Sequence, residues 1–204
     1  MEGKLILETG EIFNGLIFGK IKNVSAEIVF NTSMVGYPES MTDPSYSQQI
    51  LVLTYPCIGN YGINSEERDE NGILKYFESE KIQVSGLIIS DYCEDYSHYL
   101  SNKSLSSWMD EYEIPGLHGI DTRELTKIIR NKGTMKGKII CNKDIEIIKD
   151  IDYNLVKEVS RIKEITYNKG NKYKIIIIDC GIKNNIIKKF LKYEKITIKI
   201  VPYD

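Results

Sequence analysis

The sequence predicts a mixed α/β protein, with a β-rich N-terminal domain followed by the incomplete start of a doubly wound, parallel-sheet domain. Three observations lead to this prediction. The 204 residues include 34 Ile but a single Ala, and β-branched side chains favour strands. The N-terminal segment alternates apolar runs with turn signals. Near the C-terminus, four consecutive Ile precede a helical pattern and a second apolar run, which is typical of a β–α–β unit.

Composition excludes several classes of protein. Hydrophobic residues make up 42% of the chain and charged residues 27%, as in ordinary globular proteins, so a disordered tail, a fibre and a coiled coil are excluded. No apolar run approaches the ~20 residues that a membrane span needs, and the acidic N-terminus does not resemble a secretory signal. We therefore expect a cytoplasmic protein with no membrane partner.

Charge is unevenly distributed along the chain, although the formal net charge is only −2. Residues 161–204 carry 11 basic and 4 acidic side chains, which indicates either a nucleic-acid-binding arm or a second domain. This segment has no aromatic ladder among its lysines, and Arg161 is its single arginine. We therefore expect no nucleic-acid partner.

The four cysteines are Cys57, Cys93, Cys141 and Cys180. They are far apart and form no C-x-x-C pair, and the chain has only two histidines, so we expect no metal site. A chain of this length with a full apolar complement does not need disulfides. We expect four reduced and mostly buried thiols.

The N-terminal elements follow from apolar patterns and turn residues. Strands are predicted at residues 4–8, 11–19, 25–31 and 48–56. Thr9-Gly10 is a turn signal between the first two strands. Residues 36–47 contain two Pro, a Gly and several hydroxyl side chains, so we expect this segment to be mostly loop.

Two helices and two more strands complete the first domain. The strands are expected at 81–91 and 136–141. A helix over 104–113 has Ser104 as its N-cap. The clearer helix spans 120–133: Asp121 and Glu124 form a capping box, Leu125, Ile128 and Ile129 give the apolar stripe, and Gly133 supplies the stop.

The remainder divides the chain into domains. We expect a first domain over 1–150, a linker over 151–173, and an incomplete second domain over 174–204. In the second domain, the apolar run at 175–179 is typical of a strand buried on both faces of a parallel sheet, and a strand at 196–201 follows a helical stripe. A single β–α–β unit cannot cover its own sheet, so part of that apolar surface should be bare.

Cys180 is a candidate nucleophile, because it lies between a strand and a helix. A nucleophile elbow needs small residues two positions to each side, whereas Ile178 and Ile182 stand there. We therefore expect a buried, inert thiol. A dinucleotide-binding loop needs three glycines, and this turn has only Gly181. The sequence therefore gives little support to a dehydrogenase-type function.

Other polar residues give weaker indications. His98 and His118 stand alone, and the acidic group Asp91, Glu94 and Asp95 is typical of a solvated loop. After Asp43-Pro44, the hydroxyls of Ser45, Tyr46 and Ser47 follow one another. They could orient a small polar ligand or merely cap a turn, and the residues alone favour neither.

Three segments resemble one family. The segment EIVFNTSMVGYPESMTDPSYSQQILVLTYPCIGNYGIN (27–64) resembles the start of carbamoyl-phosphate synthase small subunits. The segment GIDTRELTKIIRNKGTMKGKI (119–139) is similar to that family's next characteristic stretch. The segment IIIIDCGIKNNIIKKFL (175–191) looks like the opening strand and helix of its class I glutamine amidotransferase domain.

The resemblance implies a ligase that takes part in arginine and pyrimidine biosynthesis. The small subunit of that family hydrolyses glutamine and passes ammonia to a large subunit, which uses ATP, magnesium and bicarbonate to make carbamoyl phosphate. The resemblance places Ser45 at the glutamine site and implies no cofactor in this chain. The family's nucleophilic Cys, in G-x-C-x-G, and its His and Glu do not occur in residues 1–204, so the chain alone should be inactive. The alternative is a non-catalytic module that docks a partner.

Overall fold

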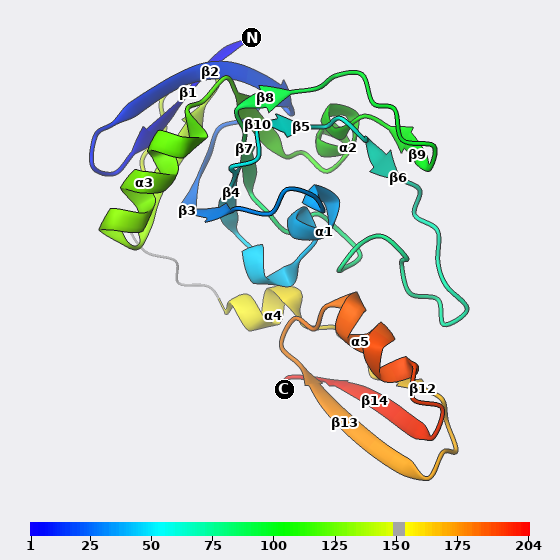
Figure 1. Ribbon diagram of the computed structural model, residues 1–204. Helices are drawn as coiled ribbons and strands as arrows, with labels where there is room; N and C mark the ends of the chain where they lie inside the picture. The colour runs from blue at the N-terminus through cyan, green and yellow to red at the C-terminus, as the bar shows by residue number, and fades with distance from the viewer. Residues whose placement is uncertain (149–153) are drawn as a thin grey trace.

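Seven strands of the N-terminal part close into a barrel, and the sequence did not predict this closure (Figure 1). The computed structural model describes residues 1–148 and 154–204. Around the barrel the order is β1-β11-β3-β4-β7-β10-β2. The bounds are β1 Glu2–Leu7, β2 Ile12–Gly19, β3 Val24–Asn31, β4 Gln49–Leu53, β7 Gly86–Ile88, β10 Pro115–His118 and β11 Met135–Ile140.

Strand pairing in the barrel is mixed. The β1–β2 hairpin is antiparallel and turns at Gly10, whose φ of 100° suits glycine. The run β3, β4, β7 and β10 is parallel. Parallel neighbours need crossover connections, and these contain α1 (Tyr37–Met41), the 3₁₀ turn η1 (Pro44–Tyr46) and α2 (Leu105–Glu111). Two small sheets lie in the same connections: β5 (Cys57–Ile58) with β8 (Asp91–Tyr92), and β6 (Ile63–Asn64) with β9 (Ser101–Lys103).

Apolar side chains fill both faces of the central strand β4. Leu51 and Leu53 belong to a buried cluster with residues of α1 and α2. Ile50 and Val52 belong to a second cluster, which includes residues of α3 (Thr122–Lys132). Successive side chains of a strand point to opposite faces, so the unbroken apolar run is explained by cover on both sides.

The predicted helix caps are confirmed. The Asp121 carboxylate accepts the Glu124 N–H at 2.8 Å, and the Ser104 hydroxyl accepts the Ser107 N–H at 3.2 Å. The apolar stripe of α3 is partly buried, with Leu125 and Ile129 inside the second cluster. These ends form as expected because a cap is made by residues within one turn of the helix.

Two predicted segments differ from the structure. Residues 36–47 are not mostly loop, because Gly36, in the left-handed region, and Pro38 start α1, and Pro44 starts η1. The strand predicted at 81–91 is regular only over β7, because the Gln83 N–H bonds to Met41 outside any ladder.

The C-terminal part is a three-stranded sheet, in the order β12-β14-β13, with one covering helix. Its elements are α4 Leu155–Val159, β12 Ile165–Tyr167, β13 Tyr173–Asp179, α5 Asn184–Leu191 and β14 Ile196–Pro202. The parallel pair β13–β14 is confirmed, and β12 adds an antiparallel strand from the stretch expected as a linker. Residues 149–153, which belong to the boundary of the expected linker, lie outside the described residues.

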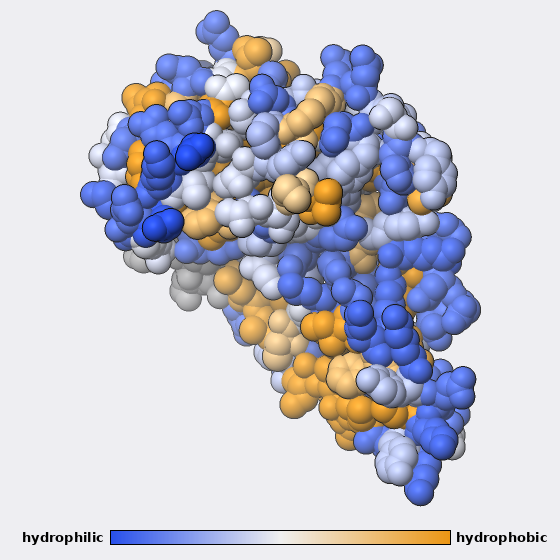
Figure 2. All heavy atoms as spheres, viewed as in Figure 1, coloured by the Kyte–Doolittle hydropathy of each residue, from blue (hydrophilic) through white to orange (hydrophobic). Residues whose placement is uncertain are grey.

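Strand β13 is covered on one face only, which confirms the prediction that a single β–α–β unit leaves part of its apolar surface bare. Ile176 is 69% exposed and Ile178 63%, whereas Ile177 packs in the cluster under α5. Figure 2 shows apolar surface over this lower part of the molecule. The apolar sequence of β13 suits a strand that is covered on both faces, but residues 154–204 cover only one of them.

Helix α5 docks on the segment between β6 and β7. The Asn184 amide donates to the Phe77 carbonyl at 3.0 Å, and the Lys188 ammonium donates to the carbonyls of Leu74 and Lys75 at 2.6 and 2.8 Å. Ile73 completes the apolar cluster under α5. These contacts set the C-terminal part against the barrel, at the place where η1 lies.

Candidate functional site

The turn that carries Ser45 is held by its own sequence. Asp43 is the N-cap of η1, and its Oδ1 accepts the Ser45 N–H at 2.9 Å. Pro44 occupies the first position, where its missing N–H costs nothing. Asn31 donates to the Tyr46 hydroxyl at 3.2 Å and fixes the turn to β3. Ser45 is left exposed at the tip.

Asp43 also connects this turn to the C-terminal part. Its Oδ2 lies 2.5 Å from the Lys183 ammonium, while only 12% of the Asp43 side chain is exposed. Partial burial makes such a pair stronger than one in open water. One carboxylate therefore holds both the backbone of Ser45 and the residue before α5.

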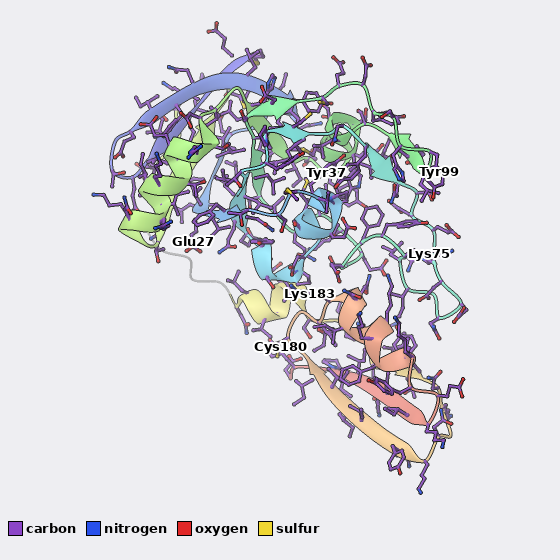
Figure 3. The ribbon with its side chains drawn as sticks, in the orientation of Figure 1. Glu27, Tyr37, Lys75, Tyr99, Cys180 and Lys183 are labelled. Atoms are coloured by element: carbon purple, nitrogen blue, oxygen red, sulfur yellow. The ribbon has the colours of Figure 1, made fainter. Side chains whose placement is uncertain are left out.

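Ser45 and Cys180 line one cavity of about 220 Å³ between the two parts. Its other walls come from β3, β4 and α4, including Glu27, Gln49 and Val159. Gln49 donates to the Glu27 carboxylate at 2.7 Å, so these two polar groups already satisfy each other. Figure 3 shows Cys180 and Lys183 together at the boundary, beside α4.

Gly181 lets the two parts approach closely. Its φ is 96°, and a Cβ there would lie 3.0 Å from Pro44 Cβ and 2.7 Å from Val159 Cγ2. Any larger residue would push the turn at 180–182 away from η1. The spacing across the cavity thus depends on a glycine on one side and a proline on the other.

Asp179 fixes the turn from inside. Its side chain is 2% exposed, Oδ1 accepts the N–H groups of Gly181 and Ile182, and Oδ2 accepts from Arg161. Burial alone would raise the pKa of Asp179, but the hydrogen bonds from Ile182, Arg161 and Gly181 outweigh it and hold the pKa below its usual value. Asp179 is therefore ionised at neutral pH and serves the structure of the turn.

Comparison with known proteins agrees with the motifs on both sides of this cavity. The model of the carbamoyl-phosphate synthase small chain, CPSase domain, matches residues 5–139, which include most of the barrel and Ser45. The chain belongs to the carbamoyl-phosphate synthase small-chain family. Similarity to individual members extends beyond the matched domain into the C-terminal part.

Three members of the family illustrate this. "Carbamoyl-phosphate synthase (ammonia), mitochondrial" from Homo sapiens is 45% identical over 202 residues, 98% of this chain and 13% of its own length. "Multifunctional protein pyr1-3" from Dictyostelium discoideum is 48% identical over 219 residues, 100% of this chain and 10% of its own. The "carbamoyl phosphate synthase arginine-specific small chain" of Chaetomium globosum is 40% identical over 211 residues, which are 100% of this chain and 46% of its own length. The chain thus spans under half the length of these relatives.

One solved structure, a peptidase M28 precursor from Shewanella amazonensis SB2B, superposes with a TM-score of 0.35 at 10% identity, over 98% of this chain and 50% of that one. So weak a likeness carries no argument about the small-chain fold. Among the described residues, no helix is both long and apolar enough to cross a membrane.

The other predicted residues lie away from the small-chain cavity or differ from expectation. Cys180 is exposed, so the prediction of a buried thiol is wrong, because the turn presents it to the cavity instead of the core. His98 is exposed, and its Nδ1 accepts the Leu100 N–H at 3.3 Å. His118 packs against Phe18 with ring centroids 5.9 Å apart, and burial lowers its pKa.

A larger cavity of about 780 Å³ lies beside the start of α3, lined by Thr122, Arg123 and Lys127 among others. The N-terminus of α3 is already capped by Asp121, and nothing there indicates a ligand. We therefore keep the smaller cavity, which holds the family motif, as the candidate site.

Sequence reasoning missed Lys183 and α4. Lys183 lies 140 positions after Asp43, and no local pattern joins them. Helix α4 had a signal, because Asn154 is a good N-cap and its side chain accepts the Lys157 N–H at 3.1 Å. Ser45 is exposed and lines the cavity, so its hydroxyl can orient a small polar molecule there.

Proposed function

We propose that the chain is part of the glutamine-hydrolysing small chain of carbamoyl-phosphate synthase, and that Ser45 orients glutamine from the barrel side. The observation that carries the proposal is the position of Ser45: its turn is capped by Asp43, the residue is exposed, and it lines a cavity together with Cys180. A fixed hydroxyl contributes orientation without joining the chemistry.

The proposal assigns no catalytic group to residues 1–204. We propose that β13, α5 and β14 open a doubly wound amidotransferase domain, on the support of the bare faces of Ile176 and Ile178. The nucleophilic thiol would come from that domain, and residues 1–204 alone would release no ammonia from glutamine. A large subunit would use ATP and magnesium to consume the ammonia.

The test is Ser45→Ala in the complete small chain, assembled with its large subunit. Loss of one hydrogen bond to a substrate costs roughly 1–3 kcal/mol, which corresponds to roughly 5- to 150-fold in KM. We expect KM for glutamine to rise in this range while synthesis from added ammonia is unchanged. Ser40→Ala is the matched control, because Ser40 accepts a hydrogen bond from Asn31 and belongs to the structure of α1. An unaltered KM in Ser45→Ala would refute the role of Ser45.

A second candidate comes from the relatives whose printed name contains ammonia. In that case the chain would belong to a synthase that takes free ammonia, and Ser45 would be a turn residue. The same assembly would then make carbamoyl phosphate from ammonia but not from glutamine, before any substitution. The presence of an exposed serine at position 45, in the lining of the cavity, favours glutamine.

A further inference from the structure

Two cysteines far apart in the sequence meet on the barrel surface. Strands β5 and β8 pair in parallel with Cys57 opposite Asp91, so Cys93, two positions further, projects from the same face of the pair. The Cys93 N–H donates to the Ile58 carbonyl at 2.9 Å and continues this ladder. The two Sγ atoms lie 2.8 Å apart, and both residues are half-buried. Backbone pairing of β5 with β8 thus brings the two thiols into direct contact.

We propose that Cys57 and Cys93 are a modification site, at which a low-molecular-weight disulfide such as oxidised glutathione converts the two thiols into a reversible intramolecular disulfide. This site lies apart from the cavity of Ser45 and Cys180, and it does not depend on the proposed function.

The chemistry is two thiol–disulfide exchanges. One cysteine thiolate attacks a sulfur of the small disulfide, which forms a mixed disulfide and expels one small thiolate. The second cysteine thiolate attacks the protein sulfur of the mixed disulfide and expels the other small thiolate. The protein loses two electrons and two protons, and one small disulfide becomes two small thiols. A reduced small thiol in excess reverses both steps.

The surroundings favour a thiol pair over a metal site. The pKa of Cys93 is raised to about 11, first by its hydrogen bond with Cys57 and then by burial, so Cys93 is a thiol at neutral pH. Among the described residues, no three His, Cys, Asp or Glu side chains gather where they could hold a metal ion. Two thiols alone are fewer ligands than a protein zinc site uses.

The cross-link would have a structural effect at a distance. It closes a chain segment that includes residues 73–78, and this is the segment that binds α5 through Phe77, Leu74 and Lys75. A closed loop restricts the unfolded chain and so stabilises the folded one. We therefore expect the oxidised form to resist unfolding of the barrel together with the docking segment of α5.

The experiment uses the 204-residue chain, first reduced and freed of reductant, then incubated with oxidised glutathione. The sample is denatured in an alkylating reagent, and its peptides are mapped by mass spectrometry. We expect a linked peptide pair joining 57 to 93, while Cys141 stays alkylated and Cys180, exposed and single, is alkylated or carries glutathione. Cys57→Ser should lose the link and carry glutathione on Cys93 instead. Cys180→Ser is the matched control and should keep the link.

Two results would overturn the proposal. The first is four unlinked cysteines in the wild-type chain after oxidation, which needs no variant to fold. The second is a 57–93 disulfide that forms equally fast in urea and in buffer, because the folded structure would then not be what brings the two thiols together. In the positive case, the urea midpoint of the oxidised chain, followed by the fluorescence of Trp108, should lie above that of the reduced chain.

Discussion

Replacement of Asp179 by asparagine should selectively loosen the C-terminal part. Each carboxylate oxygen of Asp179 accepts two hydrogen bonds. Oδ1 accepts the N–H groups of Gly181 and Ile182 at 2.9 Å, and Oδ2 accepts the backbone and side-chain N–H groups of Arg161 at 3.1 and 2.6 Å. In Asp179→Asn, the amide NH₂ faces two donors whichever way it is turned. Two hydrogen bonds are therefore lost, and donors buried beside a 2% exposed side chain are left unsatisfied.

The size of the effect follows from these losses. Each buried donor left unsatisfied costs about 1–3 kcal/mol. Because the Arg161 side chain is 25% exposed, water can satisfy some of its N–H groups. For the two lost hydrogen bonds together we therefore expect a loss of stability of about 2–4 kcal/mol. Such a change lowers hydrogen-exchange protection roughly 30- to 1000-fold.

The assay is hydrogen exchange of β13, α5 and β14, with β11 as the internal reference. Glu164→Gln makes the same carboxylate-to-amide change in the same part, but its ion pair with Lys199 is exposed on both sides and should contribute little. Equal protection in the two variants would refute the reasoning about Asp179.

Acid provides a second readout of the same carboxylate. The folded-state pKa of Asp179 is lowered, so its contribution to stability is complete above the unfolded value of about 3.9 and is lost as pH falls through the folded pKa. Protection of β13 in the wild-type chain should therefore fall below about pH 4. That dependence should be weaker in Asp179→Asn, which has no proton to gain at this position.

Two further predictions concern the barrel, each checked by the urea midpoint of Trp108 fluorescence. Asp121→Ala removes the N-cap of α3 and should destabilise the chain by about 1 kcal/mol, whereas Asp121→Asn keeps an acceptor and should cost much less; equal loss in both variants would contradict the cap. Tyr37→Phe removes the hydroxyl that donates to the buried Gly62 carbonyl at 2.7 Å and should cost about 1–3 kcal/mol. Tyr99→Phe, at a residue 87% exposed, is its control, and a similar midpoint in the two would count against this bond.

The sequence by itself determined the local elements and the family. The ends of α2 and α3 were predictable because Ser104 and Asp121 cap helices with atoms three residues away. Strands β1 to β4 and β13 to β14 were predictable because apolar runs and turn residues act within a few positions. The motif around Ser45 was sufficient to identify the small-chain family.

Only the tertiary structure decided which of these elements are neighbours. Closure of the barrel needs β11 between β1 and β3. The sequence of a strand does not specify which other strands will pair with it. The contact of Asp43 with Lys183, the sulfur contact of Cys57 with Cys93, and the exposure of Cys180 likewise join or separate residues far along the chain. Local patterns encode hydrogen bonds within a turn or a strand, whereas these contacts exist because packing of whole elements brings distant backbones together.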